Sequence, residues 1–253
     1  MPPARSGKFI KLLTAISPFV ALAGIVVLQA QEYKKSVRQL NSADYLAREQ
    51  ERARSIDWQQ QSPNLGFANL KANAAYLDFV QYFGNAHARE TIGYELVPEY
   101  FEAINSIDPR FTRAHLTLSV ANSMYAGKPD QTIALMERAL ASVEPESSDA
   151  AFLWTYKGLD ELLFMGDKQA ALDSYAMAAK WKSLTDPEYG TVTIEDLATA
   201  LENASEVELK QAQIKAWSNV LAYIRDNQRQ GEILAKIDAL KADIAALEAD
   251  AVP

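Results

Sequence analysis

Cysteine is absent from this chain of 253 residues, and its absence excludes three kinds of chemistry. Disulfide bonds, thiolate metal sites and thiol nucleophiles all need a cysteine sulfur. The compartment stays open, because proteins without thiols occur in oxidising and in reducing spaces. Apolar residues make up 49% of the chain, which suffices for a packed core.

Histidine is scarce, and the sequence motifs of common enzymes are missing. His87, expected in the polar loop 85–90, and His115, expected inside a helix, have no carboxylate at a metal-ligand spacing. No G-x-S-x-G, P-loop or G-x-G-x-x-G pattern occurs. The adjacent carboxylates Asp160 and Glu161 are interpreted as a solvated helix surface rather than as a general acid and base. We therefore predict no catalytic, cofactor or metal residues and no enzymatic activity.

Positive charge is in short supply after residue 40. Residues 1–40 carry six basic groups and Glu32, a net charge of +5, so the total of −8 leaves −13 for residues 41–253. Nucleic acids and anionic lipid surfaces both repel such an acidic domain. No nucleic-acid partner is therefore expected.

Twenty uncharged residues, Leu12 to Gln31, follow the basic N-terminus of residues 1–11. A helix of about this length spans the hydrocarbon core of a bilayer. A cleaved signal peptide has similar regions, but Leu28 rather than a small residue stands two positions before Ala30, which favours an uncleaved anchor. The apolar residues of the predicted anchor are Leu12, Ile16, Phe19, Val20, Ile25, Val26, Val27 and Leu28.

Three basic residues lie on each side of this run, so the positive-inside bias nearly cancels. The acidity of the remaining chain favours a cytoplasmic amino end and a domain on the other side of the membrane. Residues 32–62 are expected to form a helical stalk, since Tyr33 to Gln61 contains no glycine or proline. The stalk is either a solvated spacer or a partner helix for another membrane protein.

The stretch from Thr112 to Trp181 predicts two helical hairpins, each turning at a glycine. Gly127 and Gly166 lie 39 residues apart, and small and large residues recur in the same order after each of them. An acidic residue followed by proline closes each unit and predicts a helix stop. These pairs are Asp108-Pro109, Glu144-Pro145 and Asp186-Pro187.

The second of these hairpins resembles the tetratricopeptide repeat (TPR), through Gly166, Ala171, Tyr175 and Ala178. The region from Pro63 to Asp186 resembles uncharacterised membrane-anchored TPR-like proteins of cyanobacteria. That resemblance implies a thylakoid or plasma membrane, with the domain on the lumenal or periplasmic side. It also implies a role in the assembly or maintenance of a membrane complex, such as a photosynthetic complex.

An aromatic block precedes the hairpins and predicts an earlier hairpin that turns at Gly84 and returns over residues 94–107. Tyr76, Phe79 and Phe83 share one helical face. Such a stripe is usually core, and a pigment or quinone pocket is the alternative.

Three further helices are expected after residue 187. The last has Ile233, Ile237, Leu240, Ile244 and Leu247 at steps of four and three. This seam is expected to pack on Ile214, Trp217, Leu221 and Ile224 of the preceding helix, with Gly231 in the turn, and to cap the array. Homodimerisation through the seam is the alternative.

The predicted fold is all-α, a TPR-like array of helical hairpins. Its segments are a basic N-terminus (1–11), an anchor (12–31), a stalk (32–62), a TPR-like domain (63–187) and a C-terminal helical cap (188–253). We expect a scaffold that binds other proteins, such as subunits of a membrane complex, on the first helices of its hairpins. The alternatives are a permanent subunit of a membrane complex and, third, an enzyme of unknown class. The expected partner-binding residues are Thr117, Ala121, Met124, Tyr156, Asp160 and Leu163.

Overall fold

The computed structural model describes residues 22–27, 29, 41–147, 149–185 and 191–250. All regular secondary structure in this part of the chain is helical, which confirms the predicted all-α class. The chain divides into two compact units, residues 1–44 and residues 45–253. The two units are described separately.

The first unit contains a short helix over residues 22–27, where Leu22, Ile25, Val26 and Val27 are exposed. The other predicted anchor residues, namely Leu12, Ile16, Phe19, Val20 and Leu28, lie outside the described residues. Among the residues that are described, no helix combines the length and the apolar character needed to cross a bilayer.

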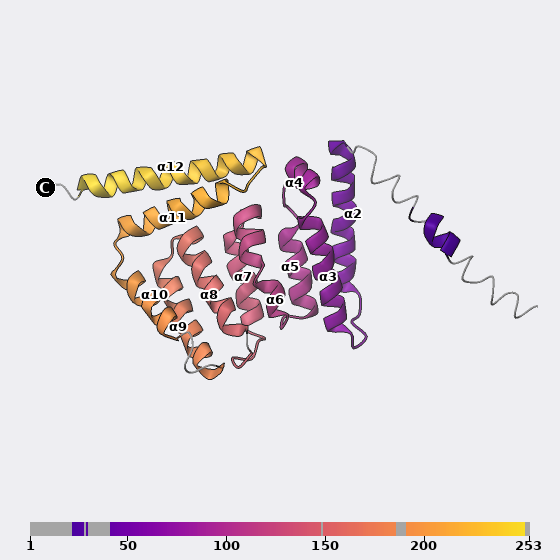
Figure 1. Cartoon of the computed structure of the whole chain (residues 1–253), viewed down its shortest axis with the longest axis horizontal. Helices are drawn as coiled ribbons and strands as arrows, with labels where there is room; N and C mark the ends of the chain where they lie inside the picture. The colour runs from indigo at the N-terminus through magenta and orange to yellow at the C-terminus, as the bar shows by residue number, and fades with distance from the viewer. Residues whose placement is uncertain (1–21, 28, 30–40, 148, 186–190, 251–253) are drawn as a thin grey trace, which may run out of the picture. The chain divides into compact units, whose positions relative to one another are not determined.

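In the second unit, six helices form a row in which each packs against the next (Figure 1). The contacts run from α3 to α5, on to α7, α8 and α9, and finally to α10. The helices of this row are α3 (Ala68–Phe83), α5 (Val97–Ile107), α7 (Pro129–Leu140), α8 (Ala150–Asp160), α9 (Lys168–Thr185) and α10 (Thr191–Asn203).

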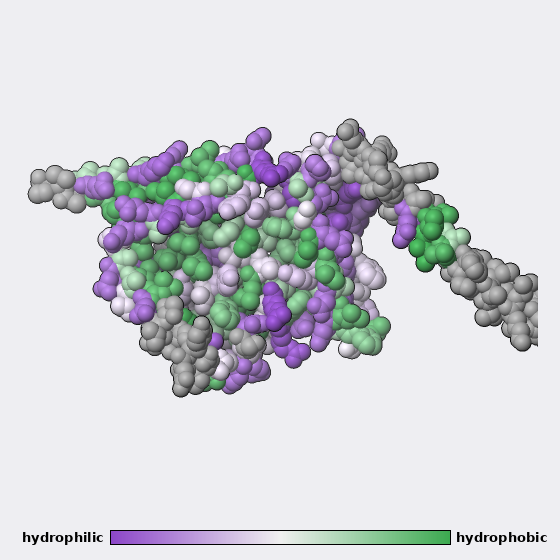
Figure 2. Space-filling view, viewed as in Figure 1, coloured by the Kyte–Doolittle hydropathy of each residue, from purple (hydrophilic) through white to green (hydrophobic). Residues whose placement is uncertain are grey.

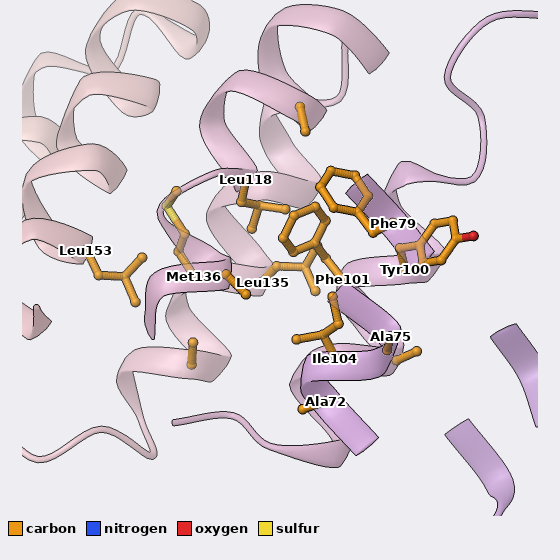
Figure 3. Close-up of a cluster of buried hydrophobic side chains, with 14 of the residues drawn as sticks. Ala72, Ala75, Phe79, Tyr100, Phe101, Ile104, Leu118, Leu135, Met136 and Leu153 are labelled. Atoms are coloured by element: carbon orange, nitrogen blue, oxygen red, sulfur yellow. The ribbon is translucent and has the colours of Figure 1, made fainter. Parts of the chain in front are cut away.

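The main hydrophobic core lies between α3, α5, α7 and α8 (Figure 3). Ala72 and Ala75 of α3 are fully buried, and such small side chains let neighbouring helices approach closely. Phe79 packs edge-on against Phe101, with ring centroids 4.8 Å apart. Leu118 and Leu135 fill the space next to these rings in Figure 3. Burial every three or four residues along α3 matches the helical period.

The two predicted hairpins each turn at their glycine, as expected. Gly127 and Gly166 both have φ of +76°, the left-handed conformation that ends many helices. The helix before each glycine ends in a π-helical segment, which the sequence did not predict. These segments are η1 (Ser119–Ala126), which follows the short helix α6 (Thr112–His115), and η2 (Glu161–Met165), which follows α8.

The predicted stalk is corrected by α2 (Ser42–Gln61). From Tyr45 onward this helix belongs to the second unit. It contributes to the hydrophobic core of that unit and is not a solvated spacer. Ile56 is only 2% exposed, and Glu49 forms an ion pair of 2.9 Å with the buried Arg89 of α4 (Ala86–Ile92). These two contacts show that α2 is packed into the second unit. The stalk residues before Asn41 lie outside the described residues.

The predicted first hairpin is also corrected. Gly84 has φ of −75°, so the chain does not turn there in the left-handed conformation. Instead the short helix α4 (Ala86–Ile92) follows, capped by the side chain of Asn85, and α5 begins only at Val97. His87 is exposed as expected, but it lies on this helix and not in a loop.

Two C-terminal helices, α11 (Glu206–Leu221) and α12 (Asn227–Asp250), form an antiparallel pair (Figure 1). Ile233, Ile237 and Leu240 pack with Trp217 and Ile224, which confirms the predicted support of the seam within one chain. Gly231 lies inside α12, so the prediction that it forms the turn is wrong. The connection is residues 222–226.

Candidate functional site: an apolar groove on the first helices of the hairpins

An open cavity of about 420 Å³ lies between α3, the α6–η1 segment and α8. We call it the apolar groove. Its walls come from the first helices of three successive helical pairs, which are the elements that the sequence predicted as the binding face. The lining residues are Tyr76, Phe79, Val80, Phe83, Gly84, Leu116, Thr117, Val120, Ala121 and Tyr156.

One wall of the groove is the aromatic stripe of α3. Tyr76, Phe79 and Phe83 lie three and four residues apart, so a single helical face presents them. Phe83 contacts Tyr94 and Tyr125 with ring centroids 5.2 Å and 5.1 Å away, while Phe79 reaches into the core. The stripe is therefore both core and wall. Because Tyr94 and Tyr125 pack against Phe83 and the core surrounds Phe79, this wall of the groove is preformed.

The opposite wall consists of Leu116, Thr117, Val120, Ala121 and Tyr156. The hydroxyl of Thr117 donates to the carbonyl oxygen of Ala114 at 2.7 Å, so this polar group is satisfied within its own segment. Val80 and Val120 are 46% and 41% exposed. Apolar side chains that remain this exposed on both walls would lose contact with water when another molecule filled the groove.

The six predicted partner-binding residues do not share one surface. Thr117, Ala121 and Tyr156 line the apolar groove. Met124 and Leu163 instead pack against the hydrophobic cluster formed by α11 and α12. Asp160 is fully buried. The C-terminal helices thus cover part of the predicted face. The prediction used the register of the hairpins, which gives no information on where these helices pack.

Asp160 is part of a buried polar layer between the two hairpins. Ser119 donates its hydroxyl to Oδ1 of Asp160 at 2.9 Å, while Oδ2 has no hydrogen-bond partner among the described residues. Burial raises the pKa of Asp160 to about 7. The hydrogen bond from Ser119 lowers this pKa, and the charge of Glu161 raises it by a smaller amount. The carboxyl group is therefore poised to change charge near neutral pH.

Glu161 is buried as well, at 4% exposure. The ammonium group of Lys157 pairs with its carboxylate, and Ser174 donates a hydroxyl to it at 2.6 Å. The prediction of a solvated surface for Asp160 and Glu161 is therefore wrong. The register shows why: 39 residues earlier stand Ala121 and Asn122, both buried. Neither carboxylate lines the apolar groove.

Other chemistry is not visible around the groove. In the described residues, no group of three or more His, Asp or Glu side chains is arranged to hold a metal ion. His115 is fully buried, with Nδ1 2.8 Å from the carbonyl oxygen of Phe111, and burial lowers its pKa. This placement confirms the expectation that His115 packs inside a helix.

The sequence missed Val80, Leu116 and Val120 as groove residues. The prediction took positions 117, 121 and 124 as one helical face. Leu116 and Val120 directly precede Thr117 and Ala121, and all four line the groove, whereas Met124 packs against the cluster of α11 and α12. Comparison of the chain with protein-family models, with curated proteins and with solved structures finds no match.

Proposed function

We propose that this chain is a membrane-anchored, TPR-like scaffold that binds a segment of another protein in the apolar groove. The proposal includes residues 12–31 as the anchor, and a thylakoid or plasma membrane with the helical domain on the lumenal or periplasmic side. Assembly or maintenance of a membrane complex is the process in which such a scaffold would act.

The observation that carries the proposal is the groove itself. The first helices of three helical pairs line the groove, and neighbouring aromatic rings support its aromatic wall. Val80 and Val120 remain exposed within it. Grooves of this kind accept the apolar side chains of a partner helix, while the surrounding polar surface sets its orientation. Matching turns at Gly127 and Gly166 support the description as a hairpin array.

The test places a charge in the groove without disturbing the core. Val80→Arg and Val120→Arg change exposed side chains, and Leu234→Arg on α12, 49% exposed, is the matched control. Membranes are solubilised gently, and the proteins that co-purify with each variant are measured. We expect both groove variants to lose at least about tenfold of the bound partner, equivalent to ~1.4 kcal/mol, while the control keeps it.

Full recovery of the same proteins with both groove variants would overturn the proposal. The size of the solubilised complex separates the scaffold from a permanent subunit. A scaffold runs mostly free, whereas a subunit co-migrates with its complex in a fixed ratio.

A further inference from the structure

The turn between α2 and α3 exposes four large apolar side chains. Trp58 is 71% exposed, Leu65 81%, Phe67 67% and Leu70 69%. All four lie within 13 residues, in or beside the connection between α2 and α3, and therefore at the same end of this pair of helices. In Figure 2 a hydrophobic cluster lies at the lower right edge of the second unit, where Figure 1 places this turn.

The backbone of this turn holds Leu65 in a conformation that residues other than glycine rarely adopt. Leu65 has φ of +47°, which is uncommon for any residue other than glycine, and Gly66 follows with φ of +84°. The amide of Phe67 donates to the carbonyl oxygen of Asn64 at 2.7 Å. Lys71 donates to the carbonyl of Ser62 and to Oδ1 of Asn64 at 3.1 Å. These bonds fix a turn that points its apolar side chains outward.

No charged residue occurs from Trp58 to Leu70, although charged residues make up 23% of the chain. Moving residues 58–70 out of water would therefore bury no charged side chain of their own, and the ammonium group that contacts the turn belongs to Lys71, which bonds to Ser62 and Asn64. Because residues 58–70 carry no charge, they do not contribute to the net negative charge of the domain. An anionic or a neutral surface can approach it without repulsion from the turn itself.

The size and shape of the turn favour lipid over a folded protein. Large side chains bury about 150–250 Å² each, so four that are partly exposed offer roughly 600 Å². A stable protein interface takes about 800 Å² from each partner, on complementary surfaces. A convex turn offers less than this. Insertion into the interface of a bilayer needs no complementary surface, and tryptophan, phenylalanine and leucine are the side chains that enter it.

We infer that the α2–α3 turn inserts Trp58, Leu65, Phe67 and Leu70 into the interfacial layer of a lipid bilayer. The turn would then be a membrane contact separate from residues 12–31 and from the apolar groove. It would fix the orientation of the helical domain against the membrane.

Trp58 is a native reporter for this contact. The other three tryptophans, Trp154, Trp181 and Trp217, are buried or half-buried. The full chain is reconstituted into dioleoylphosphatidylcholine vesicles, and the fluorescence of Trp58 is the difference between wild type and Trp58→Phe. We expect this signal to shift to the blue, to be quenched at least about twofold by lipids brominated on the acyl chain, and to be shielded from acrylamide in water.

The matched variant is Leu65→Asn with Phe67→Gln and Leu70→Gln. Asparagine tolerates the left-handed conformation at position 65, so this variant is expected to keep its fold, checked by circular dichroism. It should lose the lipid quenching, while the control Leu234→Gln should retain it. If the chain floats with the vesicles but Trp58 stays open to acrylamide, the inference is wrong and the anchor stands. Shielding of Trp58 by an added protein fraction alone would also overturn it.

Discussion

The side-chain amide of Gln213 donates a hydrogen bond of 3.2 Å to the carbonyl oxygen of Leu162. Leu162 belongs to η2 and lies four residues before Gly166. Carbonyl groups at the end of a helix lack partners within the helix, so a donor from outside satisfies one of them. In this way α11 is joined to the turn of the second hairpin.

The first hairpin is joined to α12 at the equivalent place. Nη2 of Arg229 donates to the carbonyl oxygens of Ser123 at 3.4 Å and Met124 at 3.3 Å. Ser123 lies four residues before Gly127 and 39 before Leu162. The C-terminal pair therefore contacts the same backbone feature twice, with a different side chain each time.

Glycine suits position 127 for two reasons. An alanine there would adopt φ of +76°, and the guanidinium group of Arg229 would have to shift to make room for its β-carbon. We expect Gly127→Ala to reduce the free energy of unfolding by ~1–3 kcal/mol, measured by urea denaturation. Gly231→Ala is the control, because Gly231 lies in the interior of α12 with open space around it. That change should instead stabilise by ~0.5–1 kcal/mol. Equal effects at the two glycines would contradict this account.

Arg229 should hold the end of η1 in place. Replacing Arg229 with methionine removes both carbonyl contacts and should speed amide hydrogen exchange around η1 by at least about tenfold, a change of ~1.4 kcal/mol in local opening. Arg225 is 77% exposed and, among the described residues, pairs with Glu90 at the surface, so Arg225→Met should leave that exchange unchanged. Unaltered protection of η1 in Arg229→Met would show that packing alone fixes the pair.

Asp160 should make stability depend on pH. Its pKa is raised in the folded state to about 7, so its contribution is complete below about pH 4 and is lost as the pH rises through 7. Asp160→Asn does not ionise and can still accept from Ser119. We expect the variant to gain stability over wild type between pH 5 and pH 8, by on the order of 2–4 kcal/mol. If the free energies of unfolding of the wild type and the variant changed in parallel with pH across this range, the burial of a titrating carboxyl group at position 160 would be contradicted.

The pair of Lys157 and Glu161 should be strongly coupled. Lys157→Met would leave the carboxylate of Glu161 buried with Ser174 as its remaining partner, and should cost about 3–5 kcal/mol. The double variant with Glu161→Met should recover at least half of that loss, because no buried charge remains. Thermal and urea unfolding of the wild type, both single variants and the double variant give the coupling energy. Additive losses would mean that the two groups act independently.

Much of the fold follows from local patterns. The two glycine turns, the helices that flank them and the burial of Ala171, Tyr175 and Ala178 all follow from helical spacing. The position of the C-terminal pair does not, because its hydrogen bonds to the hairpins join residues 51 to 106 positions apart. No short-range period reports such a contact.

Part of the groove lies on the face that the sequence predicted for binding, and Thr117, Ala121 and Tyr156 line it. Met124 packs against the cluster of α11 and α12, and Asp160 is fully buried, so neither lines the groove. The helical period within the hairpins does not report the long-range contacts of α11 and α12. That these residues bind a partner stays a prediction.

Site-specific photo-crosslinking in intact cells tests the binding role of the apolar groove most directly. A photoreactive amino acid replaces Val80 on one wall or Val120 on the other, and Leu234 on α12 serves as the control position. The account predicts that both groove positions capture the same protein as a discrete adduct, and that the control does not. A discrete adduct from position 234 but from neither groove position would contradict it.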